Sequence, residues 1–424
     1  MEAKTLGILG GGQLGRMSAM AARKLGIRTI IYTPEKDSPA AQIADETIVA
    51  AYEDLESLEK FSEKVEVISY EFENIPVETV EYLTKFKPVY PEKNVLEVAQ
   101  DRIREKSFLN SIGIATARWE HAENAKNVDN IVDKWGKTSC ILKTARFGYD
   151  GKGQSRYTLG DNLDATWRSL KSDRIIVEEI VDFVFEISVI VGRDRFGKTV
   201  TYGPMMNEHK RHILHKTTFP ASIAANIAAA SIAITEKLAQ QINLRGVITL
   251  EMFVTKDGQI LANEIAPRTH NSGHLTIDAC NISQFEQHVR TVCGLPALDP
   301  VCRPAEMLRD LAKLGRAYVS GSFMARSGGD AFNTLVLACP DGSTFTHDKD
   351  FPTMVFESAF YAGGEDGAYA DRLGQDGART ASQRVPARAG NSADGAFTHA
   401  GTGIGAALCW EIARNRTARR LFGK

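Results

Sequence analysis

Two glutamates, Glu251 and Glu264, stand where they could hold a metal ion between them. They lie in two strand-like runs, GVITLEMFV and QILANEIAP, which are joined through Thr255-Lys256-Asp257-Gly258. Asp-Gly between apolar runs is typical of a hairpin. A two-residue turn at Asp257-Gly258 would set Glu251 directly opposite Glu264, on one face of that hairpin.

Two carboxylates this close repel each other by roughly 4 kcal/mol at an effective dielectric constant near 20, and a hairpin gains little that offsets this cost. A divalent cation between the two carboxylates would turn this repulsion into attraction. Mg²⁺ held by one or two carboxylates plus substrate phosphates is the usual arrangement in phosphoryl-transfer sites. The sequence therefore predicts Mg²⁺ at Glu251 and Glu264. The alternative is a slipped register that leaves both side chains in solvent.

A glycine-rich segment, ILKTARFGYDGKGQ at residues 141–154, follows another expected strand. It places Lys143 at the end of the strand and Gly148, Gly151 and Gly153 in the loop behind it. Glycines let backbone N–H groups approach phosphate oxygens, and a lysine supplies a point charge for the same group. The segment predicts a nucleotide-phosphate loop, although it is not a Walker A motif. An ordinary glycine hairpin is the alternative.

Three further segments carry side chains suited to anions or sugars. DRIREKSFLN at 101–110 predicts a short helix with Arg102 and Lys106 on one face. Glu73 follows the strand VEVISY, and loops beyond the carboxyl ends of parallel strands bind ligands, so this acid could face a substrate amine or ribose hydroxyl. APRTHNSGH at 266–274 gathers Arg268, His270, Asn271 and His274. The alternatives are a solvated helix face for Arg102 and Lys106, a solvated loop acid for Glu73, and capped or satisfied loop residues for the histidines.

The first 90 residues alternate strand and helix, which predicts a parallel sheet covered by helices. Gly10-x-Gly12-x-x-Gly15 opens the first helix as a dinucleotide fingerprint would. That fingerprint requires an acid at the end of the second strand, but Thr33-Pro34 stand there, so a nicotinamide site is disfavoured. What remains is a helix N-terminus that can hold an anion such as a substrate phosphate.

Composition narrows the classes of protein. The 424 residues suffice for two to four domains, and 25% charged residues with a net charge of −2 do not favour nucleic acid or anionic membranes as partners. Six cysteines are spread singly, which predicts a reducing compartment. The sequence shows no apolar run near the roughly 18 residues of a membrane span and no signal-peptide pattern, so we expect a cytoplasmic protein.

Several segments, in this order across residues 5 to about 296, resemble the 5-(carboxyamino)imidazole ribonucleotide synthase family of the ATP-grasp superfamily. They are GGGQLGRM, YEFENIP, LKTARFGYDGKGQ, the Glu178-Glu179…Glu186 run, NEHKRHILHKTT, LEMFV and NEIAPRTHNSGH. The wider superfamily usually ends its second metal strand with Glu-x-Asn-x-Arg, whereas Glu264-Ile265-Ala266-Pro267-Arg268 follows this family. The resemblance implies an α/β protein with an open parallel-sheet (Rossmann-like) substrate-binding domain over 1–95 and an ATP-grasp fold over 96–296.

The family's reaction is implied as well: ATP phosphorylates bicarbonate to carboxyphosphate, and the exocyclic amine of 5-aminoimidazole ribonucleotide captures the carboxyl carbon. By motif match, ATP would contact Arg102, Lys143, Gly148, Gly151, Gly153, Glu178, Glu179 and Glu186, with Mg²⁺ at Glu251 and Glu264. The ribonucleotide and bicarbonate would face Gln13, Glu73, Tyr149, Asp150, Lys152, Arg268, His270 and Asn271. Of these, Lys152, Arg268, His270 and Asn271 are the expected catalytic residues. A homodimer is compatible with this family.

Past Leu295-Pro296 this resemblance ends. The family's basic segment, of Arg-Pro-x-Arg-Lys-x-Gly-His type, does not occur in the sequence. Instead, residues from about 303 to 424 resemble an internal piece of the nitrilase family of carbon–nitrogen hydrolases. Cys409 and Lys349 match that family's nucleophile and lysine. We therefore expect 297–424 to be an incomplete α/β nitrilase-like fragment that replaces the usual C-terminal domain.

Three classes of function follow from these resemblances. The first is an ATP-dependent carboxylating ligase. The second is a thiol hydrolase that cleaves nitriles or amides, which requires a glutamate base near Cys409 that no matching segment provides. The third is a catalytically silent chimeric chain. Phosphate release from ATP that depends on both bicarbonate and aminoimidazole ribonucleotide would separate the first class from the third.

Overall fold

The computed structural model describes residues 2–148, 153–210, 212–302, 319–327 and 330–348. The chain divides into two compact units. The first contains residues 1–277 and 281–300, and the second contains 278–280 and 301–424. The predicted site residues that the structure describes all lie in the first unit.

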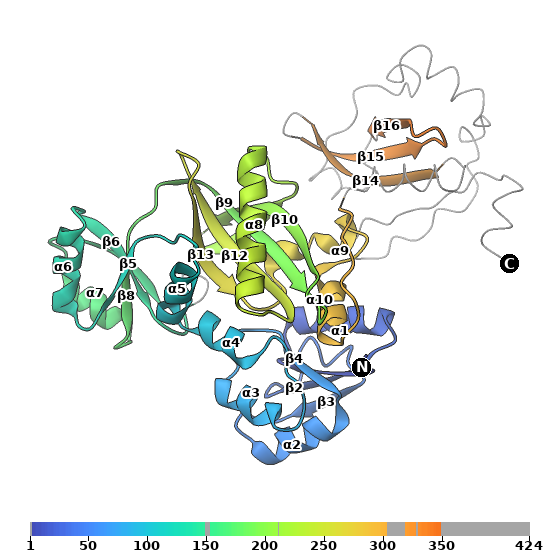
Figure 1. Ribbon diagram of the computed structural model, residues 1–424, viewed down its shortest axis with the longest axis horizontal. Coiled ribbons are helices and arrows are strands. Elements are labelled where there is room, and N and C mark those ends of the chain that lie inside the picture. The colour runs from blue at the N-terminus through green and yellow to red at the C-terminus, as the bar shows by residue number, and fades with distance from the viewer. Residues whose placement is uncertain (1, 149–152, 211, 303–318, 328–329, 349–424) are drawn as a thin grey trace, which may run out of the picture. The chain divides into compact units, whose positions relative to one another are not determined.

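The N-terminal sheet of the first unit is parallel, as predicted (Figure 1). Its strand order is β3-β2-β1-β4, with β1 at Thr5–Leu9, β2 at Arg28–Thr33, β3 at Glu46–Val49 and β4 at Val67–Tyr70. The helices between them are α1 (Gln13–Lys24), α2 (Leu55–Lys64) and α3 (Val77–Thr84). The carboxyl ends of β1 and β4 lie side by side, so their following loops meet at one edge.

Opposite faces of this sheet are covered by different helices, because alternate strand residues point to opposite sides. Leu6 and Ile8 pack with α1 and with α10 (Gln284–Val292), a helix that comes almost 300 residues later in the chain. Leu9 packs instead with side chains of α2 and α3. The return of α10 ties the N-terminal sheet to the segment that follows the predicted site residues.

Two short helices lead to a second sheet. They are α4 (Lys93–Gln100) and α5 (Arg102–Ser111), and the Asp101 carboxylate caps α5 by accepting from the backbone amides of Ile103 and Arg104 at 3.0 and 3.3 Å. The second sheet is antiparallel in the order β5-β8-β6-β7. Its elements are β5 (Trp119–Ala122), α6 (Ala125–Lys134), β6 (Ser139–Thr144), β7 (Gln154–Thr158), α7 (Leu163–Ser169) and β8 (Ile175–Glu178).

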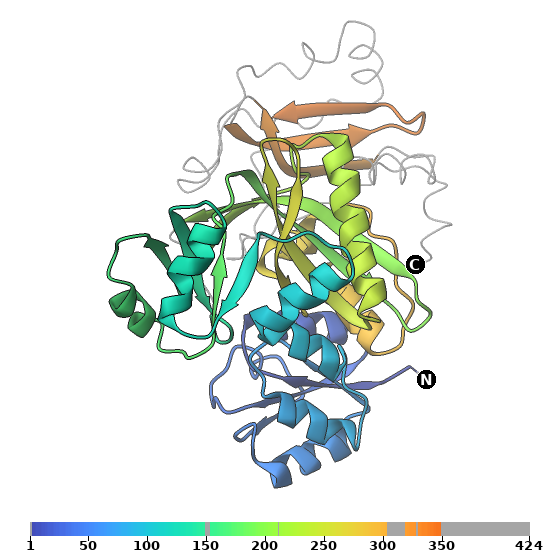
Figure 2. The same cartoon turned by 60° about the vertical axis from the view of Figure 1, so that its left-hand side comes forward.

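A larger antiparallel sheet in the order β11-β10-β9-β12-β13 follows (Figures 1 and 2). Its strands are β9 (Phe183–Arg193), β10 (Thr199–Lys210), β11 (Ile213–Thr218), β12 (Gly246–Thr255) and β13 (Ile260–Ala266). Helix α8 (Ala225–Gln241) packs Leu238 and Ala239 into the apolar core on one face of this sheet. The other elements are η1 (Asn271–Gly273) and α9 (Thr276–Ala279).

The β12–β13 hairpin pairs Glu251 with Glu264, which confirms the predicted register at that point. The predicted two-residue turn is wrong. Thr255 donates to the carbonyl of Gln259 at 3.0 Å, so the loop has three residues and places Gly258 at φ 82°. The register then shifts by one between Glu251 and Met252, leaving Asn263 as the extra residue of a bulge. The longer loop and the bulge each shift the register by one residue in opposite directions, so Glu251 still pairs with Glu264.

The second unit contains a three-stranded antiparallel meander in the order β14-β15-β16 among its described residues. The strands are β14 (Val319–Ser327), β15 (Asp330–Ala338) and β16 (Thr344–Asp348). Lys349 and Cys409 lie outside the described residues. A disulfide joins Cys280 to Cys302, which the expectation of a reducing compartment did not anticipate. The sequence gives no sign of this disulfide, because the two cysteines are 22 residues apart and only folding brings them together.

No helix within the described ranges is long and apolar enough to span a membrane.

One buried histidine of the first unit should make stability depend on pH. His288 of α10 shares a 2.9 Å hydrogen bond with Ser69 of β4, and burial lowers its pKa to about 4. The unfolded chain, with an ordinary histidine pKa near 6.5, therefore binds more protons than the folded one between those values. Stability should be full above pH 6.5 and fall by up to about 3 kcal/mol as the pH drops to 4.

Urea denaturation from pH 7.5 to 4 would measure this effect. In His288→Gln the loss of stability across that window should shrink relative to the unchanged protein, although the variant is less stable at pH 7.5. His121→Gln, at an exposed position, is the matched control and should keep the original pH profile. An identical profile in His288→Gln would contradict the prediction.

Candidate functional site

A cavity of about 290 Å³ lies where the N-terminal sheet, α5, β6 and the large sheet meet, all within the first unit. Most of the predicted site residues that the structure describes line its wall. They are Glu73, Arg102, Lys143, Gly148, Glu186, Glu251, Glu264, Arg268, His270 and Asn271. These residues come from segments spread over some 200 positions, so folding brings together what the sequence keeps apart.

The remaining predicted residues are placed differently. Gln13 reaches the site from its edge, donating from Nε2 to the Asn271 side chain at 3.4 Å. Gly153 has φ 68°, which suits glycine, and a Cβ there would come within 2.5 Å of Thr144 Oγ1. Glu178 and Glu179 are not among the residues that line the cavity. Tyr149, Asp150, Gly151 and Lys152 lie outside the described residues.

The opposed carboxylates face the cavity as predicted. Burial and the neighbouring charge of Glu251 raise the pKa of Glu264 above its ordinary range. Burial also acts on Glu251, but His270 lies 2.7 Å from its Oε1 and holds its pKa below the ordinary value. The pair is therefore electrostatically poised for a cation. Within the residues that the structure describes, no group of three or more histidine, cysteine or acidic side chains could hold a metal by itself. A bound Mg²⁺ would need further oxygens from a substrate.

Lys143 is held by a buried carboxylate rather than left free in the loop. Glu178, at 3% exposure, lies 3.1 Å from the Lys143 ammonium and 3.2 Å from that of Lys106. Burial raises the pKa of Glu178, but the two lysines outweigh it and lower the pKa below the ordinary range. Glu178 thus anchors two ammonium groups, and its expected contact with the nucleotide stays a prediction.

Lys106 is 1% exposed, so the alternative of a solvated helix face is wrong for this residue. Glu179 pairs with Lys137 at 2.7 Å on a partly exposed surface. Sequence reasoning gave both glutamates the same role, because their neighbouring positions carry no sign of which one points inward. The end of β8 decides it, since Glu178 is the last residue of that strand and Glu179 lies just beyond it.

Arg102 holds the backbone around the glycine-rich loop. Its guanidinium donates to the carbonyls of Thr144 at 2.9 Å and Gly148 at 3.2 Å. Its backbone amide also donates to the carbonyl of Ala145 at 2.8 Å. The predicted phosphate-binding arginine therefore also fixes the first part of the loop that carries Lys143.

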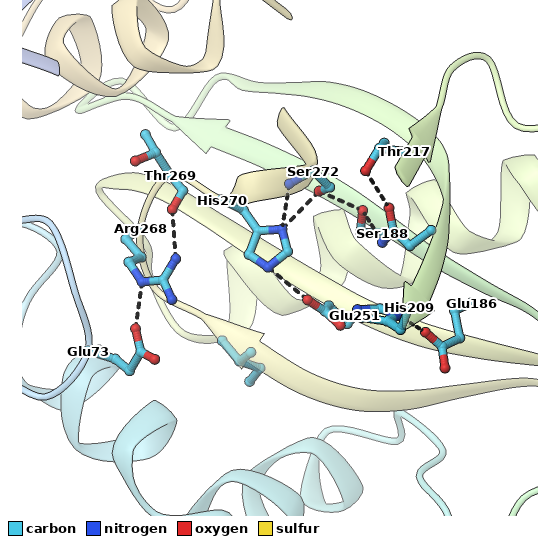
Figure 3. Close-up of polar contacts among 12 residues, drawn as sticks. Glu73, Glu186, Ser188, His209, Thr217, Glu251, Arg268, Thr269, His270 and Ser272 are labelled. Carbon is cyan, nitrogen blue, oxygen red and sulfur yellow. Dashed lines mark hydrogen bonds and ion pairs between the residues drawn. The ribbon is translucent and has the colours of Figure 1, made fainter. Parts of the chain in front are cut away.

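Arg268 and Glu73 join the N-terminal sheet to the large sheet across the cavity (Figure 3). Arg268 Nε donates to Glu73 Oε2 at 2.5 Å, and its Nη1 donates to the carbonyl of Thr269 at 3.0 Å. Burial raises the pKa of Glu73, but Arg268 outweighs it and lowers the pKa below the usual range. One oxygen of the predicted substrate-binding carboxylate is thus already engaged by arginine.

The N-terminus of α1 holds an anion, but the anion is part of the protein. Glu71 accepts from the backbone amides of Gly12 at 2.5 Å and Gly15 at 2.9 Å. Two amides at this helix N-terminus are therefore already engaged, and binding of a substrate phosphate there stays a prediction. A free helix N-terminus and an occupied one have the same local sequence, because the occupant comes from the loop after β4.

Comparison with known proteins identifies the family. Residues 3–100 match the ribonucleotide synthetase preATP-grasp domain, and residues 107–285 match the ATP-grasp domain. The N5-carboxyaminoimidazole ribonucleotide synthase of Brucella melitensis is 46% identical over 294 residues, which cover 69% of this chain and 81% of that protein. This chain belongs to the N5-carboxyaminoimidazole ribonucleotide synthase family. The predicted ATP-grasp fold with a preceding domain is thereby confirmed.

Solved structures of N5-carboxyaminoimidazole ribonucleotide synthases have the same fold. The Staphylococcus aureus enzyme complexed with ADP is 33% identical, with a TM-score of 0.67, over 70% of this chain and 80% of that one. The Aspergillus clavatus enzyme in complex with ADP and 5-aminoimidazole ribonucleotide is 25% identical, with a TM-score of 0.64, over 70% of this chain and 78% of that one. Both were solved with a nucleotide, as expected of synthases that use ATP.

The sequence analysis did not identify several residues that line the cavity of this synthase family member. His209 forms an ion pair with Glu186, whose hydrogen bond raises the histidine pKa. Glu105 accepts from the backbone amide of Ile265 at 2.5 Å, and burial raises its pKa to about 8. Asn263, the bulge residue, also lines the wall. The polar run NEHKRHILHKTT was a signal for His209, whereas nothing local distinguishes Glu105 from a surface helix residue.

Proposed function

We propose that this chain carboxylates 5-aminoimidazole ribonucleotide to 5-(carboxyamino)imidazole ribonucleotide in purine biosynthesis, using ATP, bicarbonate and Mg²⁺. One observation carries the proposal: a single cavity sets the opposed carboxylates Glu251 and Glu264 beside the cations Lys143 and Arg268. Membership of the N5-carboxyaminoimidazole ribonucleotide synthase family supports this activity. The cavity thus combines oxygen ligands for a metal with positive charge for phosphates and carboxylates.

The reaction has two steps. An oxygen of bicarbonate attacks the γ-phosphorus of ATP, the bond to the bridging oxygen breaks, and ADP leaves carboxyphosphate behind. The exocyclic amine of the ribonucleotide then attacks the carboxyl carbon, the bond to the phosphate oxygen breaks, and the amine loses a proton. Catalysis of such phosphoryl transfer is mostly positioning and electrostatic stabilisation, which fixed charges in a buried cavity supply.

The ATP side of the site is assigned from its charges. Lys143, fixed by Glu178, supplies a positive charge beside the glycine loop, and Arg102 holds the backbone of that loop. Bound Mg²⁺ would lie at Glu251 and Glu264 and neutralise charge on the transferring phosphoryl group. Glu186, on the cavity wall, remains a proposed nucleotide contact.

The ribonucleotide and bicarbonate side is assigned to the residues around Arg268. Arg268 is buried beside Glu73, and it presents fork donors that suit a carboxylate or phosphate. His270, Asn271 and Gln13 complete this side of the cavity. The proposed contacts at Tyr149, Asp150 and Lys152 rest on motif match, since these residues lie outside the described ranges.

Phosphate release tests the proposal. The chain should release inorganic phosphate from ATP only when bicarbonate and 5-aminoimidazole ribonucleotide are both present, with one phosphate per carboxylated product. Release without the ribonucleotide, or none with all substrates at saturation, would refute the assigned reaction. A cytoplasmic location, a homodimer, and domain limits at residues 95 and 296 stay predictions.

The missing basic segment should weaken binding of the ribonucleotide. If that segment supplies phosphate contacts, this chain should bind ATP normally but bind 5-aminoimidazole ribonucleotide about 10- to 150-fold more weakly, since each charge-assisted contact contributes roughly 1.5–3 kcal/mol. Calorimetry with each ligand measures both affinities, and the Brucella melitensis synthase is the reference protein. Equal affinity for the ribonucleotide in the two proteins would show that other groups replace the segment.

The nitrilase-like segment should have no hydrolase activity. A thiol at its ordinary pKa is only a few per cent thiolate at pH 7, so Cys409 needs an organised base and a positive partner to act as a nucleophile. Lys349 matches the positive partner, but the matching glutamate base is missing from the sequence. A screen of nitriles and amides should show no turnover. Turnover that Cys409→Ala abolishes would establish the hydrolase instead.

A further inference from the structure

The junction between α4 and α5 contacts both sides of the cavity through one glutamine. Gln100, the last residue of α4, is 8% exposed and lines the cavity. Its side-chain Nε2 donates to the backbone carbonyls of Glu73 at 2.7 Å and Ile75 at 2.6 Å. Its Oε1 accepts from Arg146 Nη2 at 2.6 Å. A single amide therefore joins the loop after β4 to the segment that begins the glycine-rich loop.

The partners of this amide fix its orientation. A carbonyl oxygen can only accept and a guanidinium can only donate, so the Gln100 nitrogen must face the loop after β4 and its oxygen must face Arg146. Both N–H groups of the amide are used in this orientation. A buried polar group without a partner is costly, so movement of either segment away from Gln100 is disfavoured. The positions of the two segments are therefore linked.

The loop after β4 supports the ribonucleotide and bicarbonate side of the proposed site. Glu73, whose carbonyl Gln100 holds, accepts through its carboxylate from Arg268 Nε at 2.5 Å (Figure 3). Because the carbonyl and the carboxylate belong to the same residue, the bond from Gln100 limits where this carboxylate can hold the guanidinium. The position of Arg268 therefore depends on Gln100.

The segment after Arg146 supports the ATP side and has an unusual conformation. Phe147 has φ 61°, which a bulky side chain rarely adopts, and it lines the cavity, as Lys143 does. Such a conformation persists only where neighbouring contacts hold it. Arg102 holds carbonyls on both sides of Phe147, and Gln100 holds the side chain of Arg146 directly before it. The junction between α4 and α5 therefore fixes this part of the cavity wall.

We propose that Gln100 is a positioning residue that couples the two sides of the cavity, so that carboxyphosphate formed on the ATP side lies within reach of the ribonucleotide amine. This role rests on the proposed function and explains how its two steps stay together. Gln100 acts through Glu73 on one side and through Arg146 on the other. Such a capture requires closely held reactants, because a misplacement of about 1 Å can slow a reaction by roughly 100-fold.

Loosening this link should separate the two steps of the reaction. Formation of carboxyphosphate takes place on the ATP side, whereas its capture requires the amine on the other side to lie in line with it. If capture slows, water attacks the carboxyl carbon instead, the bond to the phosphate oxygen breaks, and bicarbonate and phosphate leave without product. The ratio of phosphate released to ribonucleotide carboxylated then rises above one.

Gln100→Met and Arg146→Ala test the link at its centre and at one end. Gln100→Met nearly keeps the size of the side chain but removes its three hydrogen bonds, so the phosphate released per carboxylated product should rise about twofold or more. Arg146→Ala removes one of these bonds and should raise the ratio less, whereas Arg146→Lys keeps a donor and should recover part of the change. Because Arg146 is exposed, Arg146→Ala should fold even if Gln100→Met does not.

Two control variants separate this role from a purely structural one. Gln287 of α10 is fully buried and is not among the residues that line the cavity. Gln287→Met should therefore lower the stability to urea but keep one phosphate per product. Arg156→Ala, at an exposed position of β7, should change neither quantity. A ratio that stays at one in Gln100→Met and Arg146→Ala, or that rises as much in Gln287→Met, would overturn the inference.

Side-chain amide ¹⁵N–¹H spectra test the link without any turnover. In the unchanged protein the two Gln100 amide hydrogens should exchange slowly with solvent, and their signals should disappear in Gln100→Met, which assigns them. In Arg146→Ala they should exchange about 10-fold faster or more, because a hydrogen bond to a charged group contributes about that factor. Rapid exchange of both Gln100 amide hydrogens in the unchanged protein would overturn the inference.

These outcomes separate the inference from the proposed function. If the unchanged protein forms no carboxylated product, the proposed function fails, and the exchange of the Gln100 amide hydrogens alone decides whether the two segments are linked. If product forms with one phosphate each and both Gln100→Met and Arg146→Ala keep that ratio, the positioning role is wrong while the proposed function stands.

Discussion

Glu264→Gln should weaken Mg-ATP binding by more than the roughly 10- to 100-fold that is typical when an outer partner of a metal site is removed. The substitution removes a charge from a direct oxygen ligand with almost no change in volume. It also removes the repulsion between Glu264 and the paired Glu251, which raises the pKa of Glu264 in the absence of metal. The variant should therefore be at least as stable to urea as the unchanged protein.

Calorimetry with Mg-ATP and urea denaturation measure the two effects separately. Glu63→Gln, an exposed glutamate in α2, is the matched control and should leave both unchanged. Unchanged Mg-ATP affinity in Glu264→Gln would remove the assignment of Mg²⁺ to the hairpin. A marked loss of stability would show that this carboxylate serves the fold instead.

Glu178→Gln should lower the free energy of unfolding by about 3–5 kcal/mol, the usual cost of breaking a buried ion pair from one side. Its carboxylate is the counter-charge within 3.2 Å of two ammonium groups, those of the buried Lys106 and of the cavity-lining Lys143. Without it, the lysines repel each other in a site of low polarity. Because nucleotide phosphates would return negative charge to the same place, added Mg-ATP should stabilise this variant more than the unchanged protein.

Thermal unfolding with and without Mg-ATP provides the measurement. Glu179→Gln is the control beside it in sequence, since Glu179 is partly exposed and pairs with Lys137 at the surface. Such pairs contribute only about 0–1 kcal/mol, so Glu179→Gln should unfold almost as the unchanged protein does. Equal losses of stability in the two variants would mean that the ion pairs of Glu178 with Lys106 and Lys143 contribute no more than a surface ion pair does.

The cavity carries charges of both signs on different elements of the fold. Its acidic side chains, Glu251 and Glu264, lie on the β12–β13 hairpin. Its basic side chain Lys143 lies on a different element, β6. Two of these charges have a local partner in the protein, His270 for Glu251 and Glu178 for Lys143. The site is therefore organised before a substrate arrives, which lowers the reorganisation needed for phosphoryl transfer.

The sequence by itself determined the kind of fold and most of the cavity wall. Alternating strands and helices indicated the parallel N-terminal sheet, because periodicity and turn residues are local properties. Motif order indicated the family, and the charged residues within those motifs largely line one cavity. Even the pairing of Glu251 with Glu264 was predicted, although the three-residue loop and the bulge at Asn263 that produce it were not.

Only the tertiary structure decided which charges face the cavity and which support it. Glu178 anchors two lysines, Glu71 accepts from two amides at the helix N-terminus, and the Ser272 hydroxyl lies 2.8 Å from His270 Nδ1. Each partner comes from a different element or from a backbone group, and the energy of a buried charge or hydroxyl depends on the atoms packed around it. Residue type and spacing along the chain do not contain that information, because it arises only when distant segments meet.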